Sequence, residues 1–210
     1  AARYKDLLRA ALTNAGVPTP AFQVVPASTD PAAMAAEQCY PVVLKPLHLS
    51  ASRGVIRADN PAGFVAAFKR IGALLATPDV RDRDADAAGR ILVEEYVPGI
   101  EVAVEAMLDD GRLRVLALFD KPDPLTGPFF EETLYITPSR LPEETQVLIR
   151  DTTAHAAEAL GLVEGPVHAE LRDEPPEPGL QFSHLGLARG GFHRPLAQSL
   201  CRWSAALSPP

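Results

Sequence analysis

Hydrophobic residues recur along this chain with two different spacings, and each spacing predicts a different kind of element. Apolar residues three and four positions apart predict helices over 4–15, 61–75 and 142–160, and a shorter helix is expected over 31–38. Proline opens the second and third of the long helices, and glycine follows the first and the third. These residues mark where the predicted helices begin and end.

Runs of β-branched and apolar residues predict strands around these helices. The expected strands cover residues 41–45, 54–58, 91–97, 101–108, 112–119, 131–136 and 165–172. Strand 101–108 alternates, with one face formed by Val102, Val104, Ala106 and Leu108. Strand 112–119 is expected to continue it as a hairpin, with one face formed by Leu113, Val115, Ala117 and Phe119. Helices and largely antiparallel strands together predict an α+β protein.

Two stretches lack either spacing. Residues 77–90, rich in Asp and Arg, are expected to form a mobile loop. Residues 173–179 have the composition of a linker, and the tail that follows shows neither a helical nor a strand period.

Composition narrows the functional class. The 210 residues carry a formal net charge of −7, and the arginines are scattered, which argues against a nucleic-acid partner. No apolar run has the length of a membrane span, and the charged amphipathic N-terminal segment does not resemble a signal peptide. The two cysteines have no metal-type or redox-type spacing, so a cytoplasmic setting is the default expectation.

Lys45 ends a predicted buried strand, and a loop of small residues follows it. A lysine there is costly to desolvate unless an anion meets it, and the N–H groups of a small-residue loop bind phosphate oxygens. The pattern therefore predicts a polyphosphate site formed by Lys45 and the loop Ser50, Ala51, Ser52, Arg53 and Gly54. The alternative is a strand-end lysine that reaches solvent.

Other carboxylates lie on predicted strands. The stretch Glu94, Glu95, Tyr96, Val97 ends in Pro-Gly, and it is expected to form a joint between two lobes whose backbone could bind an adenine edge. The alternative is a row of solvent-facing carboxylates on an edge strand. His168 and Glu170 share one face of the last strand, where a carboxylate suits Mg²⁺. Glu131 and Glu132 are candidates for binding a substrate ammonium or a metal, or for the polar face of a strand.

The segments "YPVVLKPLHLSASRGV", "ILVEEYVPGIEVAVE" and "GPVHAEL", in this order, resemble the ATP-grasp superfamily of carboxylate–amine ligases. The resemblance runs from about Tyr4 to Arg172. "FDKPDPLTGPFFEETLYITPS" is most similar to the branch with biotin-carboxylase-like and carbamoyl-phosphate-synthase-like domains, near amino-acid and dipeptide ligases of the bacilysin and carnosine synthase type.

This resemblance implies a two-lobed ATP-grasp fold, incomplete at both ends. The implied segments are an N-terminal helix and extended linker over 1–25, a small lobe with the phosphate loop over 26–95, a large lobe over 96–172, and a Pro-rich linker with an atypical tail over 173–210.

The resemblance also implies ATP and Mg²⁺ as cofactors. The implied catalytic residues are Lys45 and Glu132, with Lys45 on the phosphates and Glu132 near the substrate. The implied nucleotide-binding residues are Lys45, 50–54, Glu94, Glu95, Tyr96, Val97 and, at the ribose, Glu101. Glu170 is the implied metal ligand. The implied reaction joins a small carboxylate and an amine, such as two amino acids, through an acyl phosphate. Neither a nucleic acid nor a membrane is an expected partner, and a homodimer is left open.

Two departures keep an alternative open. Tyr135 occupies the place of an expected histidine, which leaves the substrate specificity undetermined. The resemblance implies a paired strand after Glu170 that carries a second metal carboxylate. We interpret this metal-ligand strand as missing, because His184 and Arg189 are the ionisable residues there and no Asp or Glu follows Glu177. A frameshifted tail would explain this departure. The chain could therefore be a non-catalytic nucleotide-binding module instead of a ligase. An α+β interaction domain without a ligand is the third reading.

Overall fold

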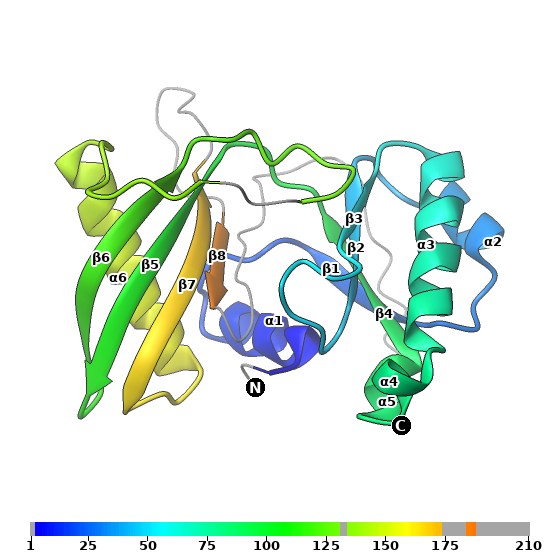
Figure 1. The fold of residues 1–210 in the computed structure, drawn as a ribbon, viewed down its shortest axis with the longest axis horizontal. Coiled ribbons are helices and arrows are strands. Elements are labelled where there is room, and N and C mark those ends of the chain that lie inside the picture. The colour runs from blue at the N-terminus through cyan, green and yellow to red at the C-terminus, as the bar shows by residue number, and fades with distance from the viewer. Residues whose placement is uncertain (1–2, 131–133, 174–183, 188–210) are drawn as a thin grey trace.

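The computed structural model describes residues 3–130, 134–173 and 184–187, and within them the chain forms two four-stranded antiparallel sheets side by side (Figure 1). The first sheet has the order β1-β4-β2-β3, and the second has the order β6-β5-β7-β8. The strands of the first sheet are β1 (Phe22–Pro26), β2 (Val42–Pro46), β3 (Ile56–Ala58) and β4 (Arg90–Glu95). Those of the second are β5 (Ile100–Asp109), β6 (Arg112–Lys121), β7 (Gly165–Asp173) and β8 (His184–Leu187). The chain passes from one sheet to the other between Glu95 and Ile100.

Helices α2 (Pro31–Ala36) and α3 (Pro61–Leu75) cover the first sheet. Helix α3 begins where the Asn60 side chain accepts a hydrogen bond from the Gly63 N–H and Pro61 takes the first helical position. Its apolar face packs on the sheet through Phe64, Phe68, Ile71 and Leu75. This periodic burial confirms the helix predicted over 61–75.

Helices α1 (Lys5–Asn14) and α6 (Glu143–Ala159) pack against the second sheet. Leu8 and Leu12 of α1 join the same core as Val102, Val104, Ala106 and Leu108 of β5, so the predicted face of β5 is confirmed. The predicted face of β6 is only half right. A register shift between Glu105 and Ala106 leaves Leu116 exposed and turns Leu118, rather than Phe119, into the core.

Residues 77–90 are not the expected loop. They form the short helices α4 (Pro78–Arg81) and α5 (Ala85–Ala88), which bury Val80 and Ala87. The polar composition misled because a few buried apolar residues and the cap at Asp84 are enough to fix two helical turns.

Two other expectations fall on the later part of the chain. Of the strand expected at 131–136, residues 131–133 lie outside the described residues, and Ile136 forms an isolated bridge with Asp120. The strand expected to carry a second metal carboxylate is only partly found: β8 pairs antiparallel with β7 and sets Gly186 opposite Glu170, but its residues include no Asp or Glu. This strand is only four residues long, which is too short to show a clear period in the sequence.

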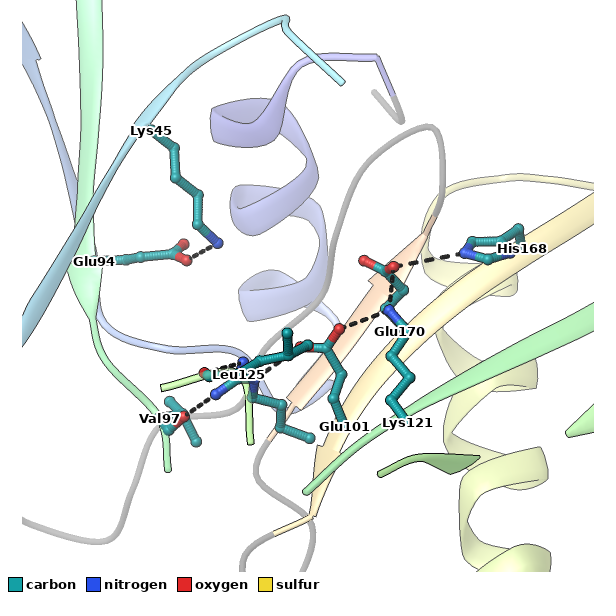
Figure 2. Close-up of polar contacts among 9 residues, drawn as sticks. Lys45, Glu94, Val97, Glu101, Lys121, Leu125, His168 and Glu170 are labelled. Carbon is teal, nitrogen blue, oxygen red and sulfur yellow. Dashed lines mark hydrogen bonds and ion pairs between the residues drawn. The ribbon is translucent and has the colours of Figure 1, made fainter. Parts of the chain in front are cut away.

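The joint between the sheets is held by Arg172 at the end of β7. Its guanidinium donates to the carbonyl oxygen of Val97 at 3.0 Å and to that of Leu125 at 2.9 Å (Figure 2). On the other side Arg57 of β3 donates to the carbonyl oxygen of Thr126 at 2.8 Å. Loop 122–130 therefore bridges the second sheet to the edge of the first.

Candidate functional site

A buried charge triad lies in the first lobe. Lys45, at the end of β2, is 8% exposed and forms an ion pair with the Oε1 atom of Glu94 on the central strand β4 (Figure 2). Arg9 of α1 places Nε and Nη2 each 3.1 Å from the other oxygen, Oε2. Two cations share one carboxylate, so the triad carries one net positive charge when all three are ionised. Lys45 does not reach into solvent and Glu94 does not lie on an edge strand, so both alternative interpretations of these residues are wrong.

Electrostatics in the triad follow from burial. Burial lowers the pKa of Lys45, Glu94 opposes that change, and the positive charges of Arg9 and Arg172 lower it further. For Glu94, burial alone would raise the pKa, but Arg9 and Lys45 together hold it below its ordinary value.

The predicted phosphate loop forms a tight turn directly after Lys45. Ala51 and Ser52 both have positive φ, and the Arg53 N–H donates to the Ser50 carbonyl oxygen at 3.3 Å. Gly54 is required, because at φ +79° a Cβ there would lie 2.8 Å from Leu74 and Pro46 atoms. The side chain of Lys5 donates to the Leu49 carbonyl oxygen at 2.6 Å, and Arg53 pairs with Asp79 at 3.0 Å. The loop is thus anchored at both ends, while residues 50–53 are exposed.

The joint 94–97 uses part of its backbone within the protein. The N–H of Glu95 donates to the Ala21 carbonyl oxygen at 3.0 Å, and the N–H of Tyr96 donates to that of Pro41 at 3.1 Å. Burial raises the pKa of the half-buried Glu95. The Tyr96 ring lies beneath the Arg57 guanidinium, 3.9 Å from its centroid, with Arg172 at 5.6 Å. Adenine contacts at Glu95 and Val97 therefore stay a prediction that must use other backbone groups of this stretch.

A second charge cluster lies on the strands of the second sheet. Lys121 Nζ, at the end of β6, is 2.7 Å from an oxygen of Glu101 on β5 and 2.7 Å from an oxygen of Glu170 on β7 (Figure 2). The other oxygen of Glu101 accepts from Arg172 Nε at 2.8 Å. Two cations here meet two carboxylates, so the structure brings the predicted metal ligand and the predicted ribose contact together through one ammonium group.

These contacts shift the ionisation of the cluster. Burial opposes the charge on Lys121, but Glu170 and Glu101 outweigh it and raise its pKa. Burial would raise the pKa of Glu170, yet His168, whose Nε2 is 3.7 Å away, and Lys121 lower it overall. His168 has a raised pKa, caused first by Glu170 and then by Glu105 at 2.6 Å from its Nδ1.

The second charge cluster provides few ligands for a metal ion by itself. Among the described residues no group of three or more acidic, His or Cys side chains gathers as a metal site. Mg²⁺ usually takes only one or two carboxylates and completes its shell with phosphates and water. Glu170, ionised at neutral pH and on a rigid strand, fits that limited role.

The remaining candidates are spread more widely. Glu131, Glu132 and Arg189 lie outside the described residues, and His184 starts β8 opposite Arg172. Tyr135 packs edge-on against Phe119, with Lys121 Nζ 5.0 Å from its ring centroid. The site residues proposed from the sequence therefore stay predictions, although Lys45, Glu94, Glu101 and Glu170 occupy two charge clusters.

Sequence reasoning missed four cations of the site, namely Lys5, Arg9, Lys121 and Arg172. Arg9 and Arg172 are buried and meet carboxylates 85 and 71 residues away, so no local pattern marks them. Lys121 carried a signal, because it ends an apolar strand as Lys45 does.

Comparisons with known proteins agree with this architecture. The family model described as "ATP-grasp domain" matches residues 38–178. The alanine–anticapsin ligase of Bacillus subtilis (strain 168) is 30% identical over 192 residues, covering 85% of this chain and 40% of that protein. The D-alanine–D-alanine ligase of Aromatoleum aromaticum is 28% identical over 148 residues, covering 70% and 44% respectively. The crystal structure of an L-amino acid ligase from Bacillus licheniformis superposes with a TM-score of 0.72 at 32% identity, covering 82% of this chain and 39% of that one.

The chain spans about two fifths of the length of these relatives. The family match nevertheless covers more than half of this chain and includes the triad lysine, the loop after it, the joint and both clustered carboxylates of the second sheet. The chain belongs to the ATP-grasp domain family.

Proposed function

We propose that this chain is the ATP-binding part of a ligase that joins a carboxylate to an amine through an acyl phosphate. The observation that carries the proposal is the buried triad of Lys45, Glu94 and Arg9, which has one positive charge in excess beside a small-residue loop. In a protein of net charge −7, a buried excess of positive charge suits a polyphosphate. The relatives named as ligases support the same assignment.

The first half-reaction needs positioning and charge neutralisation. A carboxylate oxygen of the substrate attacks the γ-phosphorus of ATP, the bond from that phosphorus to the β-bridging oxygen breaks, and ADP leaves. Lys45 supplies a fixed positive charge for the transferring phosphoryl group, and the loop 50–54 supplies backbone N–H groups. Bound Mg²⁺, with Glu170 as a ligand, would neutralise phosphate charge. Glu170 lies on β7 and Lys45 on β2, so a nucleotide that meets both bridges the two sheets.

The second half-reaction forms the amide. The amine nitrogen attacks the acyl carbon, the bond from that carbon to the phosphate oxygen breaks, and inorganic phosphate leaves as the nitrogen loses a proton. Alanine, D-alanine and L-amino acids in the names of the relatives suggest amino acids as both substrates. Glu132 and the adenine and ribose contacts at 94–97 and Glu101 are proposed from the sequence motifs.

We favour a ligase over a non-catalytic module because relatives that match most of this chain are named as ligases. None of the helices in the described residues has the length and apolar composition of a membrane span. A cytoplasmic location and a homodimer stay predictions.

The proposal is tested by isothermal titration of ATP, with and without Mg²⁺, beside phosphate release over pairs of amino acids. We expect ATP binding that Lys45→Met weakens, and phosphate release that depends on an amino acid. The matched control is Lys69→Met, which changes an exposed lysine of α3. ATP binding without phosphate release would favour the non-catalytic module. Equal ATP affinity in wild type and Lys45→Met would refute the phosphate site.

A further inference from the structure

Arg9 is a fully buried cation whose role the reaction scheme does not explain. It sits on α1 at 0% exposure, among apolar neighbours that pack into the core of the second sheet. Its guanidinium nevertheless turns to the first sheet and contacts Glu94 Oε2 through Nε and Nη2, each at 3.1 Å. Removing the Arg9 guanidinium from water costs free energy, and the ion pair with Glu94 offsets that cost.

The division of the Glu94 carboxylate is the informative feature. Arg9 takes Oε2 and Lys45 takes Oε1, so each oxygen has its own cation. Without Arg9, Lys45 and Glu94 would form a closed pair with no net charge. With Arg9, the triad keeps one positive charge, and Lys45 is the cation with exposed surface, since Arg9 has none.

We infer that Arg9 is a positioning residue that keeps Lys45 available for a polyphosphate by neutralising and holding Glu94. This inference rests on the proposed ATP site and adds the residue that sets its charge. Arg9 does not touch the ligand; it acts through Glu94 on Lys45. If this is its role, changing Arg9 should alter the affinity for ATP and leave the affinity for adenosine, which lacks phosphates, unchanged.

The test compares ATP with adenosine in variants that change the triad charge stepwise, each measured by isothermal titration. The wild type has a charge of +1, Arg9→Gln has 0, Glu94→Gln has +2, and Arg9→Gln/Glu94→Gln returns to +1. We expect Arg9→Gln to lower the ATP affinity about tenfold or more while adenosine binding stays unchanged, because only the phosphates feel this charge. Glu94→Gln should raise the ratio of ATP to adenosine affinity, and the double variant should return toward the wild-type ratio.

Two further variants separate positioning from a structural role. Arg9→Lys keeps the charge but loses the contact through two nitrogens, so it should retain more of the preference for ATP over adenosine than Arg9→Gln does. In a Lys45→Met background, Arg9→Gln should lower the ATP to adenosine ratio less than it does in the wild type, because the residue through which Arg9 acts is gone and only the change in triad charge remains. If Arg9→Gln does not fold, Glu94→Gln and the double variant, which leave no unpaired buried carboxylate, still order the ratios by charge.

The outcomes distinguish this inference from the proposed function. A wild-type chain that fails to bind ATP refutes the proposed function. A wild-type chain that binds ATP, together with an Arg9→Gln variant that loses ATP and adenosine affinity equally, overturns only the role of Arg9. Ratios that do not follow the triad charge overturn it as well.

Discussion

Replacing Lys121 by Met tests whether the second charge cluster is held together by one ammonium group. In the wild type, Lys121 Nζ lies 2.7 Å from both Glu101 and Glu170, and its side chain is 3% exposed. The substitution leaves two carboxylates facing each other without that cation. Arg172 still pairs with Glu101 in the variant, so the lost ion pair mainly affects Glu170.

The magnitude follows from burial. Removing one partner of a buried ion pair costs about 3–5 kcal/mol. Because the Glu170 side chain is 33% exposed, water screens part of this, and we expect the free energy of unfolding to fall by about 2–3 kcal/mol at pH 7. For a chain of this size that lowers the Tm by about 4–12 °C.

The pH dependence gives the reasoning a second test. The pKa of Glu170 is lowered in the folded state, so its pairing stabilises the fold above the ordinary carboxyl pKa and is lost as the pH falls through the folded value. The pKa of Lys121 is raised, so its contribution is complete at and below neutral pH. The gap between variant and wild type should therefore begin to shrink as the pH falls to about 4, the ordinary pKa range of carboxyl groups, and shrink further as the pH falls through the lower folded pKa of Glu170.

Urea unfolding at pH 7 and at about pH 3 measures both effects, with Lys69→Met on the exposed face of α3 as the control. A loss for Lys121→Met no larger than that for Lys69→Met would refute the bridging role. An equal loss at the two pH values would show that the effect comes from packing of the aliphatic stem instead.

Four further experiments test other parts of the structure. Mg²⁺ should raise the Tm of Lys121→Met more than that of the wild type if Glu170 is a metal ligand, because the competing ammonium is gone; an equal rise in differential scanning fluorimetry contradicts this. Gly54→Ala should cost about 2 kcal/mol or more, because φ is +79° and Leu74 and Pro46 block a Cβ, whereas Gly72→Ala, with open space around it, should be stabilising by about 0.5–1 kcal/mol in thermal melts. In urea unfolding, Leu118→Ala should lower the free energy of unfolding by about 2–3 kcal/mol and Leu116→Ala by less than about 0.5 kcal/mol, because only Leu118 is buried. A larger loss for Leu116→Ala than for Leu118→Ala would contradict the register shift in β6. Burial first, and then Lys45, lower the pKa of Lys5 to about 7, so its contribution to stability should rise with pH from about 7 to 10.5, and an NMR titration of Lys5 near 10 would contradict this.

The sequence predicted the elements whose periodicity is long and regular. The spacing of Phe64, Phe68 and Ile71 predicted α3, and the alternation from Val102 to Leu108 predicted the buried face of β5. It could not predict β1, whose five residues include a proline at the sheet edge and alternate little in burial. The β6 register also escaped prediction, since one inserted residue reverses the faces beyond it.

The candidate site could be predicted only where a charge stands beside a recognisable strand. Lys45 and Glu170 are such residues, each ending or following an apolar run. Arg9 and Arg172 are not, because their carboxylate partners are more than seventy residues away and their burial depends on how the lobes pack. Glu94 shows the same limit. The family resemblance implied that it lines the adenine, and no local pattern indicated that its side chain holds two cations.

The distribution of charge between the two sheets supports the proposal that both contribute to one nucleotide site. On the first sheet, two cations meet one carboxylate, and the excess positive charge favours a phosphate group. On the second, Lys121 and Arg172 meet Glu101 and Glu170, so a metal ion at Glu170 would compete with Lys121, and a negatively charged ligand would favour its binding. A polyphosphate could serve as that ligand, since it would pair with the excess positive charge on the first sheet and bring negative charge to the cluster on the second. Arg172 fixes the spacing through Val97 and Leu125, so loss of its contacts should weaken nucleotide binding even though its own charges are already paired.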